Sequence, residues 1–362
     1  MMKEKEKQLF KGLCKFQESS FDEKLLQFAT PSVLGCLFFN RMQGIAYDVL
    51  KKHDALGKVN REFRNSLAAA YEQNVQKNRS FYQCVAMLSR ILSFCNCNVA
   101  MLKGAYLCAH YPSGYRTAND VDLLVLPKDV TAIGNLLTSA GFVQGNIRNG
   151  EFVPATRYEI IESKMMRGET VPYIKEVNLP FMRFFEVDIN FSLDYRESND
   201  SILEDMLSKI CIKQEKGLVI PTVDDVDFFI HLCAHLYKEA TTLPWIKMNR
   251  DMTLYKYCDI YMLLSEMSEE DIKRILQRAK EIEMEKICAY AILETIGLFD
   301  IENDFIYQKA LAVISEEPNF CLKIIAPKDK KVLIYQTADV NDRFFMEARE
   351  RDLKEVDYDA KT

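Results

Sequence analysis

The sequence lacks any apolar run of the roughly 20 residues that a helix needs to span a bilayer. It begins with two methionines followed by alternating lysine and glutamate, without the hydrophobic core of a signal peptide. The sequence has no excess of positive charge: 47 Lys and Arg against 53 Asp and Glu give a net charge of −6. We therefore expect a cytoplasmic protein with no membrane partner. We also expect no binding of long nucleic acid, because that depends on a basic surface.

Two common nucleotide-binding signatures are missing as well, since the chain contains neither a phosphate loop nor a GxGxxG motif. Eleven cysteines are present, but they are scattered, and Cys95-x-Cys97 is the only close pair. We expect reduced thiols, as in most cytoplasmic proteins, and a redox or metal-binding role for Cys95 and Cys97 is the less favoured alternative. With 362 residues, 48% of them hydrophobic, the chain is long enough for two or three globular domains.

The sequence does contain a pair of aspartates at the start of an apolar run. Asp120 and Asp122 flank one valine, and the apolar residues 123–126 follow. Because residues i and i+2 of a strand point to the same face, both carboxylates would project together from the start of a buried strand. Two hard oxygen ligands on a rigid edge suit Mg²⁺ when substrate phosphates complete its coordination. The pair indicates phosphoryl or nucleotidyl chemistry, with two solvated carboxylates as the alternative.

The segment before this pair suits phosphate binding. Residues 98–102 have the pattern of a short strand that ends in Lys103-Gly104, and residues 105–110 can form one or two helical turns. Glycine permits close approach of the backbone to a ligand, and amides at a helix start favour anions. After a turn comes Arg116. Lys103 and Arg116 are therefore candidates for binding phosphate, with ordinary surface charge as the alternative.

A third candidate carboxylate lies in a later segment. Residues 185–193 alternate with period two, which predicts a strand with apolar residues on the core side and polar residues on the other. Asp188 is on the polar side, and Glu186 is a neighbouring carboxylate that could be mistaken for it or could tune it. A half-exposed edge strand with a polar face is the alternative interpretation.

Together these motifs resemble the nucleotidyltransferase superfamily typified by DNA polymerase beta, and more closely its poorly characterised bacterial branch. The matching residues are Leu102-Lys103-Gly104, Tyr111-Pro112, Arg116 and Asp120-Val121-Asp122-Leu123-Leu124-Val125. Asp188 matches the third aspartate of the family, in a motif that usually reads Val-Asp-Leu-His-Trp. Asn190 replaces the histidine of that motif, and Ala105 stands where the superfamily commonly has serine.

The resemblance implies a fold and an activity. The fold would be α+β, a mixed β-sheet core of the nucleotidyltransferase type flanked by N-terminal and C-terminal helical regions. The activity would be transfer of a nucleoside monophosphate from a nucleoside triphosphate, ATP by analogy, to a hydroxyl of a small molecule, peptide or protein, with release of pyrophosphate.

The resemblance also assigns residues to this activity. Asp188 would take the proton of the acceptor hydroxyl in addition to binding metal. Cations near the phosphates would stabilise their negative charge. Two Mg²⁺ ions would be held by Asp120, Asp122 and Asp188. The nucleotide would be bound by Lys103, Gly104 and Arg116.

Hydrophobic periodicity predicts the remaining elements. Helices are expected at 60–94, 130–140 and 228–238, with further helical sequence at 271–314. Strands are expected at 142–147, 157–163, 173–177 and 331–336. The predicted regions are an N-terminal helical region at 1–97, the catalytic core at 98–200, a C-terminal helical domain at 201–340 and a charged tail at 341–362. We expect the tail to be a solvated helix that frays.

Other interpretations of single motifs are weaker. His231 and His235 lie four residues apart on the predicted helix 228–238, a spacing that can bind zinc. The metalloprotease form of that motif needs a glutamate directly after the first histidine, where this chain has Leu232, so packing or substrate-lining histidines are favoured.

Two rival functions also use an Asp-x-Asp motif or this fold. In metal-dependent glycosyltransferases the apolar strand typically precedes the motif, whereas here polar residues 116–119 precede it and the apolar run follows. A non-catalytic nucleotide-binding or antitoxin-like module could keep the fold. Three clustered carboxylates argue against such a module, because they repel one another unless a metal compensates.

Overall fold

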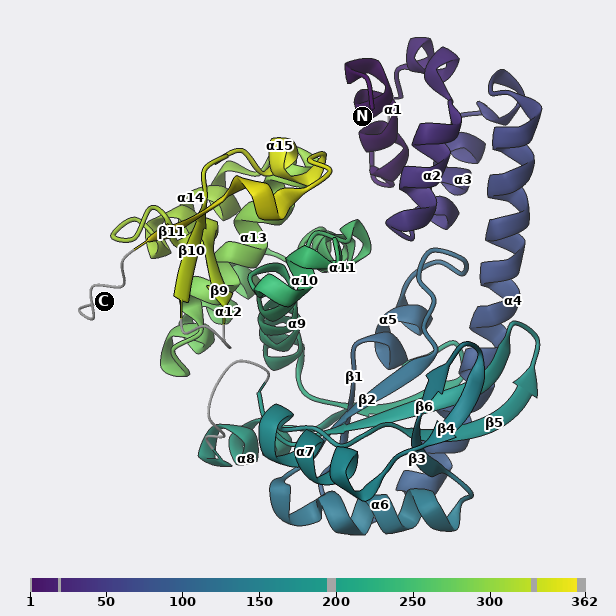
Figure 1. Ribbon diagram of the computed structural model, residues 1–362, viewed down its shortest axis with the longest axis vertical. Helices are drawn as coiled ribbons and strands as arrows, with labels where there is room; N and C mark the ends of the chain where they lie inside the picture. The colour runs from purple at the N-terminus through teal and green to yellow at the C-terminus, as the bar shows by residue number, and fades with distance from the viewer. Residues whose placement is uncertain (1, 19–20, 194–199, 327–330, 357–362) are drawn as a thin grey trace. The chain divides into compact units, whose positions relative to one another are not determined.

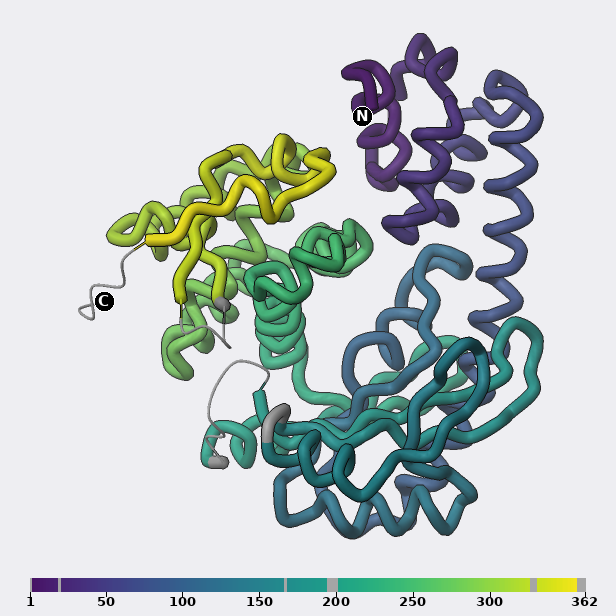
Figure 2. The backbone as a smooth tube through the Cα atoms, in the orientation of Figure 1, coloured from purple at the N-terminus to yellow at the C-terminus, as the bar shows by residue number. Residues whose placement is uncertain are grey.

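The computed structural model describes residues 2–18, 21–193, 200–326 and 331–356. The chain folds into two compact units: the first contains residues 1–67 and 229–362, and the second contains residues 68–228. Figure 2 follows the chain from its purple N-terminus out of the first unit along one long helix, through the second unit and back. The second unit is thus an insertion between two halves of the first.

Within the described residues, a mixed six-stranded sheet forms the centre of the second unit (Figure 1). Its strand order is β1-β2-β6-β5-β3-β4; β2 and β6 run parallel, and the other neighbouring pairs are antiparallel. The expected α+β class with a mixed sheet and helical regions is confirmed. The strands are β1 (Ala100–Leu102), β2 (Asp120–Leu124), β3 (Val143–Arg148), β4 (Glu151–Pro154), β5 (Tyr173–Leu179) and β6 (Met182–Asn190).

Alternation along the two central strands decides which side chains enter the core. On β6, Val187 and Ile189 are fully buried, as the period-two pattern predicted. On β2, Val121 is fully buried, whereas Asp120 and Asp122 share the opposite face. The acidic residues therefore project away from the apolar layer that fixes the strands.

Helices and a hairpin complete the second unit. A Cβ on Gly134 of α6 would lie 2.4 Å from the Tyr173 hydroxyl on β5, so the helix approaches this strand at a glycine. In the described part of the chain, no helix is long and apolar enough to cross a membrane. The elements are α4 (Arg61–Leu92), α5 (Gly104–His110), η3 (Pro127–Asp129), α6 (Val130–Ser139), α7 (Arg157–Arg167), α8 (Asp200–Ser208), β7 (Cys211–Glu215), β8 (Leu218–Thr222) and α9 (Asp225–Ala240), which leads into the first unit.

Two segments differ from the predicted secondary structure. Residues 157–163, expected as a strand, belong to α7, which begins with a capping box of Thr156 and Glu159 and ends at Gly168 in the left-handed conformation. These helix-end signals outweigh the short apolar alternation that predicted a strand.

Residues 211–222, in a region expected to be helical, form the hairpin β7–β8 instead. Its turn contains Lys216 and Gly217, both with positive φ.

The first unit is predominantly helical and is assembled from both ends of the chain. The Asn40 side-chain oxygen accepts a hydrogen bond from the Leu254 N–H at 3.0 Å, and the rings of Phe10 and Phe344 stack with centroids 5.7 Å apart. Its elements are α1 (Glu4–Cys14), η1 (Glu23–Phe28), α2 (Pro31–Phe39), α3 (Gln43–Lys52), η2 (Leu56–Lys58), α10 (Leu243–Lys247), α11 (Leu254–Leu264), α12 (Glu269–Glu281), α13 (Glu285–Phe299), α14 (Asp304–Val313), η4 (Phe320–Leu322), β9 (Lys323–Ala326), β10 (Lys331–Tyr335), α15 (Val340–Phe344), η5 (Arg349–Asp352) and β11 (Leu353–Val356).

The described part of the predicted tail, residues 341–356, packs into the first unit and does not form the solvated helix that its charge predicted. Arg343 is only 1% exposed, and its guanidinium donates hydrogen bonds to both carboxylate oxygens of Glu294 at 2.8 and 2.9 Å. Arg349 donates in the same way to Asp251, at 2.6 and 2.7 Å. Specific acidic partners thus draw these arginines into the interior, which a count of charges does not reveal.

The cysteines also differ from expectation at one place. A disulfide joins Cys95 and Cys97, whose Cα atoms are 5.5 Å apart, after α4 ends and before β1 begins. That separation lies within the range for disulfides, so the expectation of reduced thiols is wrong for this pair. The other nine cysteines, all within the described residues, are not in disulfides, and most of them are buried.

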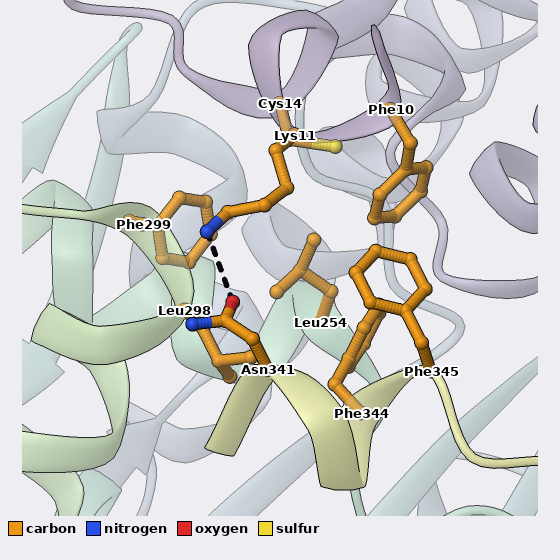
Figure 3. A pocket seen from close by; sticks show the side chains of 9 residues that line it. All are labelled: Phe10, Lys11, Cys14, Leu254, Leu298, Phe299, Asn341, Phe344 and Phe345. Atoms are coloured by element: carbon orange, nitrogen blue, oxygen red, sulfur yellow. Dashed lines mark hydrogen bonds between the residues drawn. The ribbon is translucent and has the colours of Figure 1, made fainter. Parts of the chain in front are cut away.

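A small cavity lies in the first unit between segments from both ends of the chain (Figure 3). Lys11 donates a hydrogen bond from Nζ to the Asn341 side-chain oxygen at 2.9 Å beside it. The centre of a water molecule can reach only about 10 Å³ of the cavity. The cavity therefore has room for about one water. The cavity is therefore a packing defect without space for a substrate. It is lined by Phe10, Lys11, Cys14, Leu254, Leu298, Phe299, Asn341, Phe344 and Phe345.

Candidate functional site

Parallel pairing of β2 and β6 places four carboxylates on one face of the sheet. Asp122 lies opposite Asp188 in the register, and Asp120 lies opposite Glu186. Residues two apart on a strand share a face, so the four side chains form two adjacent rows. The structure thus brings the three aspartates predicted from the sequence onto neighbouring strands.

Crowding in these rows disfavours ionisation of the carboxylates. The pKa of Glu186 is raised by burial and by the charge of Asp120. A cation would therefore relieve repulsion at this face. The pKa of Asp188 is raised well above its ordinary value, first by burial and then by the neighbouring carboxylates of Asp122, Asp120 and Glu169.

Lys103 forms an ion pair inside this site. Its Nζ lies 3.0 Å from Oδ1 of Asp122, and the two side chains are only 14% and 13% exposed. The amide of Asn190 donates to the same oxygen at 3.4 Å, near the long limit for an N–H···O hydrogen bond. Oδ1 of Asp122 is therefore shared by a cation from the end of β1 and a neutral donor from β6. Lys103 also acts to lower the pKa of Asp188.

The backbone at Lys103 has an uncommon conformation. Its φ of 47° and ψ of −115° lie outside the regions that residues other than glycine usually adopt. Gly104 begins α5, and a Cβ there would lie only 2.8 Å from the Cβ of Ala118. The Lys-Gly pair therefore lets α5 start in close contact with the segment before β2. This steric role of Gly104 is visible in the structure, whereas its contact with a nucleotide stays a prediction.

Arg116 lies in a loop that α4 holds through two buried asparagines. The Asn78 amide donates to the Arg116 carbonyl at 2.7 Å, and its oxygen accepts from the Gly114 N–H at 3.0 Å. Asn74 donates to the Gly114 carbonyl at 3.0 Å. The Arg116 guanidinium donates to the carbonyl of Thr117. The structure thus fixes the loop backbone, and a contact between Arg116 and phosphate stays a prediction.

Comparison with known proteins gives the family. A family model described as an uncharacterised nucleotidyltransferase matches residues 29–299, more than half of the chain. The chain belongs to this nucleotidyltransferase family. It is also similar to a crystal structure of an antigenic nucleotidyltransferase-like protein from Paracoccidioides brasiliensis, with 13% identity and a TM-score of 0.36. That match covers 69% of this chain and 95% of the other. No curated protein matches this chain.

Membership in a nucleotidyltransferase family implies a nucleoside triphosphate donor and a metal ion. The donor set suits Mg²⁺ by type, because it consists of hard carboxylate oxygens, and by charge, because these carboxylates repel one another. Across residues 2–18, 21–193, 200–326 and 331–356, no three His, Cys, Asp or Glu side chains lie close enough to form a ready-made metal site. The residues therefore fit the ion chemically, and binding it would draw their oxygens closer together.

Some residues around the candidate site were not predicted from the sequence. Glu169 follows the left-handed Gly168, and its backbone forms a bridge with Asn190 beside the aspartates. No local pattern marks it, because the contact depends on the fold. The buried asparagines 74 and 78 had a detectable signal, since two amides four residues apart lie on one face of a long helix.

The two histidines of α9 belong to the first unit of the nucleotidyltransferase chain. His231 is buried, and His235 Nε2 lies 3.6 Å from a carboxylate oxygen of Glu239. Glu239 also forms an ion pair with Lys256. Burial of His231 and the pairing of His235 with Glu239 favour the packing interpretation over a zinc site.

Proposed function

We propose that this chain is a Mg²⁺-dependent nucleotidyltransferase that transfers a nucleoside monophosphate from a nucleoside triphosphate to a hydroxyl and releases pyrophosphate. The register of β2 and β6, which sets Asp122 beside Asp188 with Asp120 on the same face, is the main support. Family membership supports the same class of chemistry. ATP is the donor favoured by the resemblance, and the acceptor would be a small molecule, a peptide or a protein.

Asp120, Asp122 and Asp188 would hold the metal. When bound, Mg²⁺ stabilises charge on the attacking and leaving oxygens of an in-line displacement at phosphorus. Asp188 would accept the proton of the acceptor hydroxyl.

Lys103 and Arg116 would bind the triphosphate. Lys103 already lies within the carboxylate site, 3.0 Å from Asp122, so a short rotation of its flexible stem can carry the ammonium group to a phosphate beside the metal. Arg116 offers a planar guanidinium on a loop whose backbone α4 holds in place. Cations that meet the phosphates stabilise the negative charge that develops on the leaving pyrophosphate.

Calorimetric titration of each common nucleoside triphosphate, with and without Mg²⁺, into the wild type and Asp122→Asn tests this function. We expect binding that requires Mg²⁺ in the wild type and is abolished in the variant, because one metal ligand and the anchor of Lys103 are lost together. Detection of pyrophosphate in the presence of candidate hydroxyl acceptors then tests turnover.

Asp129→Asn is the matched control, because it removes a carboxylate a few residues beyond β2 and away from the paired rows. It should bind nucleotide like the wild type. Equal binding by wild type and Asp122→Asn would eliminate the proposed site. Failure of the folded wild type to bind any triphosphate would favour a non-catalytic module that retains the fold.

A further inference from the structure

One oxygen of Asp122 has two donors in the structure. Oδ1 is 3.0 Å from the ammonium of Lys103 and 3.4 Å from the amide of Asn190. Both members of the ion pair are largely buried, so solvent screens their interaction less than it would at the surface. The metal ligand and the phosphate-binding lysine of the proposed function are therefore paired with each other.

We propose that Lys103 competes with the divalent cation for Asp122 and thereby makes metal binding depend on the triphosphate. This inference rests on the proposed function. A divalent cation on either oxygen of Asp122 would lie within a few ångströms of the ammonium, and the two like charges would repel strongly. The ion alone therefore binds weakly. A triphosphate offers Lys103 a new anionic partner, and Asp122 becomes available to the metal.

The geometry of Lys103 suits such an exchange. Its backbone is held in a sparsely populated conformation that brings the side chain to Asp122. Four rotatable bonds let the ammonium move without any change in the sheet. Asn190 is neutral, so its hydrogen bond does not oppose the cation and can keep Asp122 oriented after Lys103 leaves. Two ligands coupled in this way raise each other's affinity by the same factor.

Titration of Mn²⁺ alone, and then of ATP at saturating Mn²⁺, into the wild type and Lys103→Met tests the proposal. Loss of the lysine should tighten binding of Mn²⁺ alone by about tenfold, because a charge-assisted contact to the ligand is removed. The same substitution should weaken binding of ATP at saturating Mn²⁺ by a similar factor. A lysine with a merely structural role would not shift the two affinities in opposite directions.

Two further variants keep the result interpretable. Lys103→Arg retains the positive charge, so it should bind Mn²⁺ alone as weakly as the wild type does. This variant keeps the proposal testable if Lys103→Met fails to fold. Lys128→Met removes a 70% exposed lysine from the same unit and should leave Mn²⁺ affinity unchanged. Equal Mn²⁺ affinity in the wild type and Lys103→Met, or an equal gain in Lys128→Met, overturns the inference while leaving the proposed function intact. Absence of metal-dependent ATP binding in the wild type would instead overturn the proposed function.

Discussion

At the scale of one residue, the Asp188 carboxylate lowers the stability of the fold that positions it. Its carboxylate is partly buried between neighbours of the same charge, and both effects raise its pKa. A group whose pKa is raised on folding makes the folded state less stable as the pH rises through that pKa, because the unfolded chain ionises more easily. At neutral pH the aspartate therefore lowers stability unless a cation binds beside it.

Replacement of Asp188 by asparagine should reverse this effect. In EDTA, we expect Asp188→Asn to raise the free energy of unfolding by about 0.5–2 kcal/mol, a typical gain when a functional group is replaced by a stabilising one. Addition of Mg²⁺ and the triphosphate should raise the unfolding temperature of the wild type and leave that of the variant unchanged. Thermal and urea unfolding, followed by circular dichroism, measure both effects.

Asp129→Asn again serves as the control, since it also removes one negative charge from the second unit. It should not raise stability in EDTA. A variant Asp188→Asn that is less stable than the wild type in EDTA would show that the aspartate has a stabilising role in the fold, contrary to the crowding argument.

At the scale of elements, α4 holds the loop that leads into β2 in place through hydrogen bonds. Asn74 and Asn78 are buried and satisfy backbone groups of residues 114 and 116. Gly114 has a φ of 90°, and a Cβ there would lie 2.7 Å from the Tyr71 ring. Only glycine lets the loop lie this close to the helix. The position of Arg116 therefore depends on α4 as well as on its own loop.

We expect Asn78→Ala to affect both stability and binding. It leaves the Gly114 N–H and the Arg116 carbonyl without their partner, which should cost about 1–3 kcal/mol. The loosened loop should also weaken triphosphate binding through Arg116. Urea unfolding and calorimetry measure the two effects, and Gln76→Ala, an exposed position on the same helix, should change neither. Loss of stability with unchanged affinity would separate Arg116 from nucleotide binding.

The elements also show what the sequence could predict. Period-two alternation identified β6 and the apolar run identified β2, because burial of one face is a local property of a strand. Alternation misassigned α7, whose capping box and final glycine decide its structure. Register between β2 and β6 was beyond the sequence, since parallel pairing joins segments far apart in the chain. Contacts that depend on it, such as Asn190 with Asp122, could not be predicted either.

At the scale of the whole molecule, the first unit depends on both ends of the chain. Lys11 of α1 forms an ion pair with Asp300 and a hydrogen bond with Asn341. The sequence predicted a solvated tail for residues 341–362, because charged residues dominate there. Charge composition does not reveal that Arg343 and Glu294, 49 residues apart, meet in the interior. The tail prediction therefore failed where a long-range ion pair decides the structure, and residues 357–362 lie outside the described part of the chain.

This buried pair should matter more for stability than surface pairs do. We expect Arg343→Met to lower the free energy of unfolding of the first unit by about 3–5 kcal/mol, because Glu294 is left as a buried charge without its partner. Hydrogen exchange followed by mass spectrometry should show faster exchange in α1, α13 and α15, with the sheet of the second unit unchanged.

Removal of both charges decides between pairing and packing as the cause. Arg343→Met combined with Glu294→Met eliminates the unpaired carboxylate, so it should restore most of the lost stability and slow the exchange in α1 again. Arg351→Met, at an exposed arginine of the same segment, should change neither unit. If the double variant is as unstable as Arg343→Met, the arginine acts through its contacts with the surrounding aromatic rings, such as that of Tyr335, and the charge of Glu294 is not the cause. If exchange accelerates equally in both units, the two units unfold together. The C-terminal segment then stabilises the second unit as well as the first, to which it belongs.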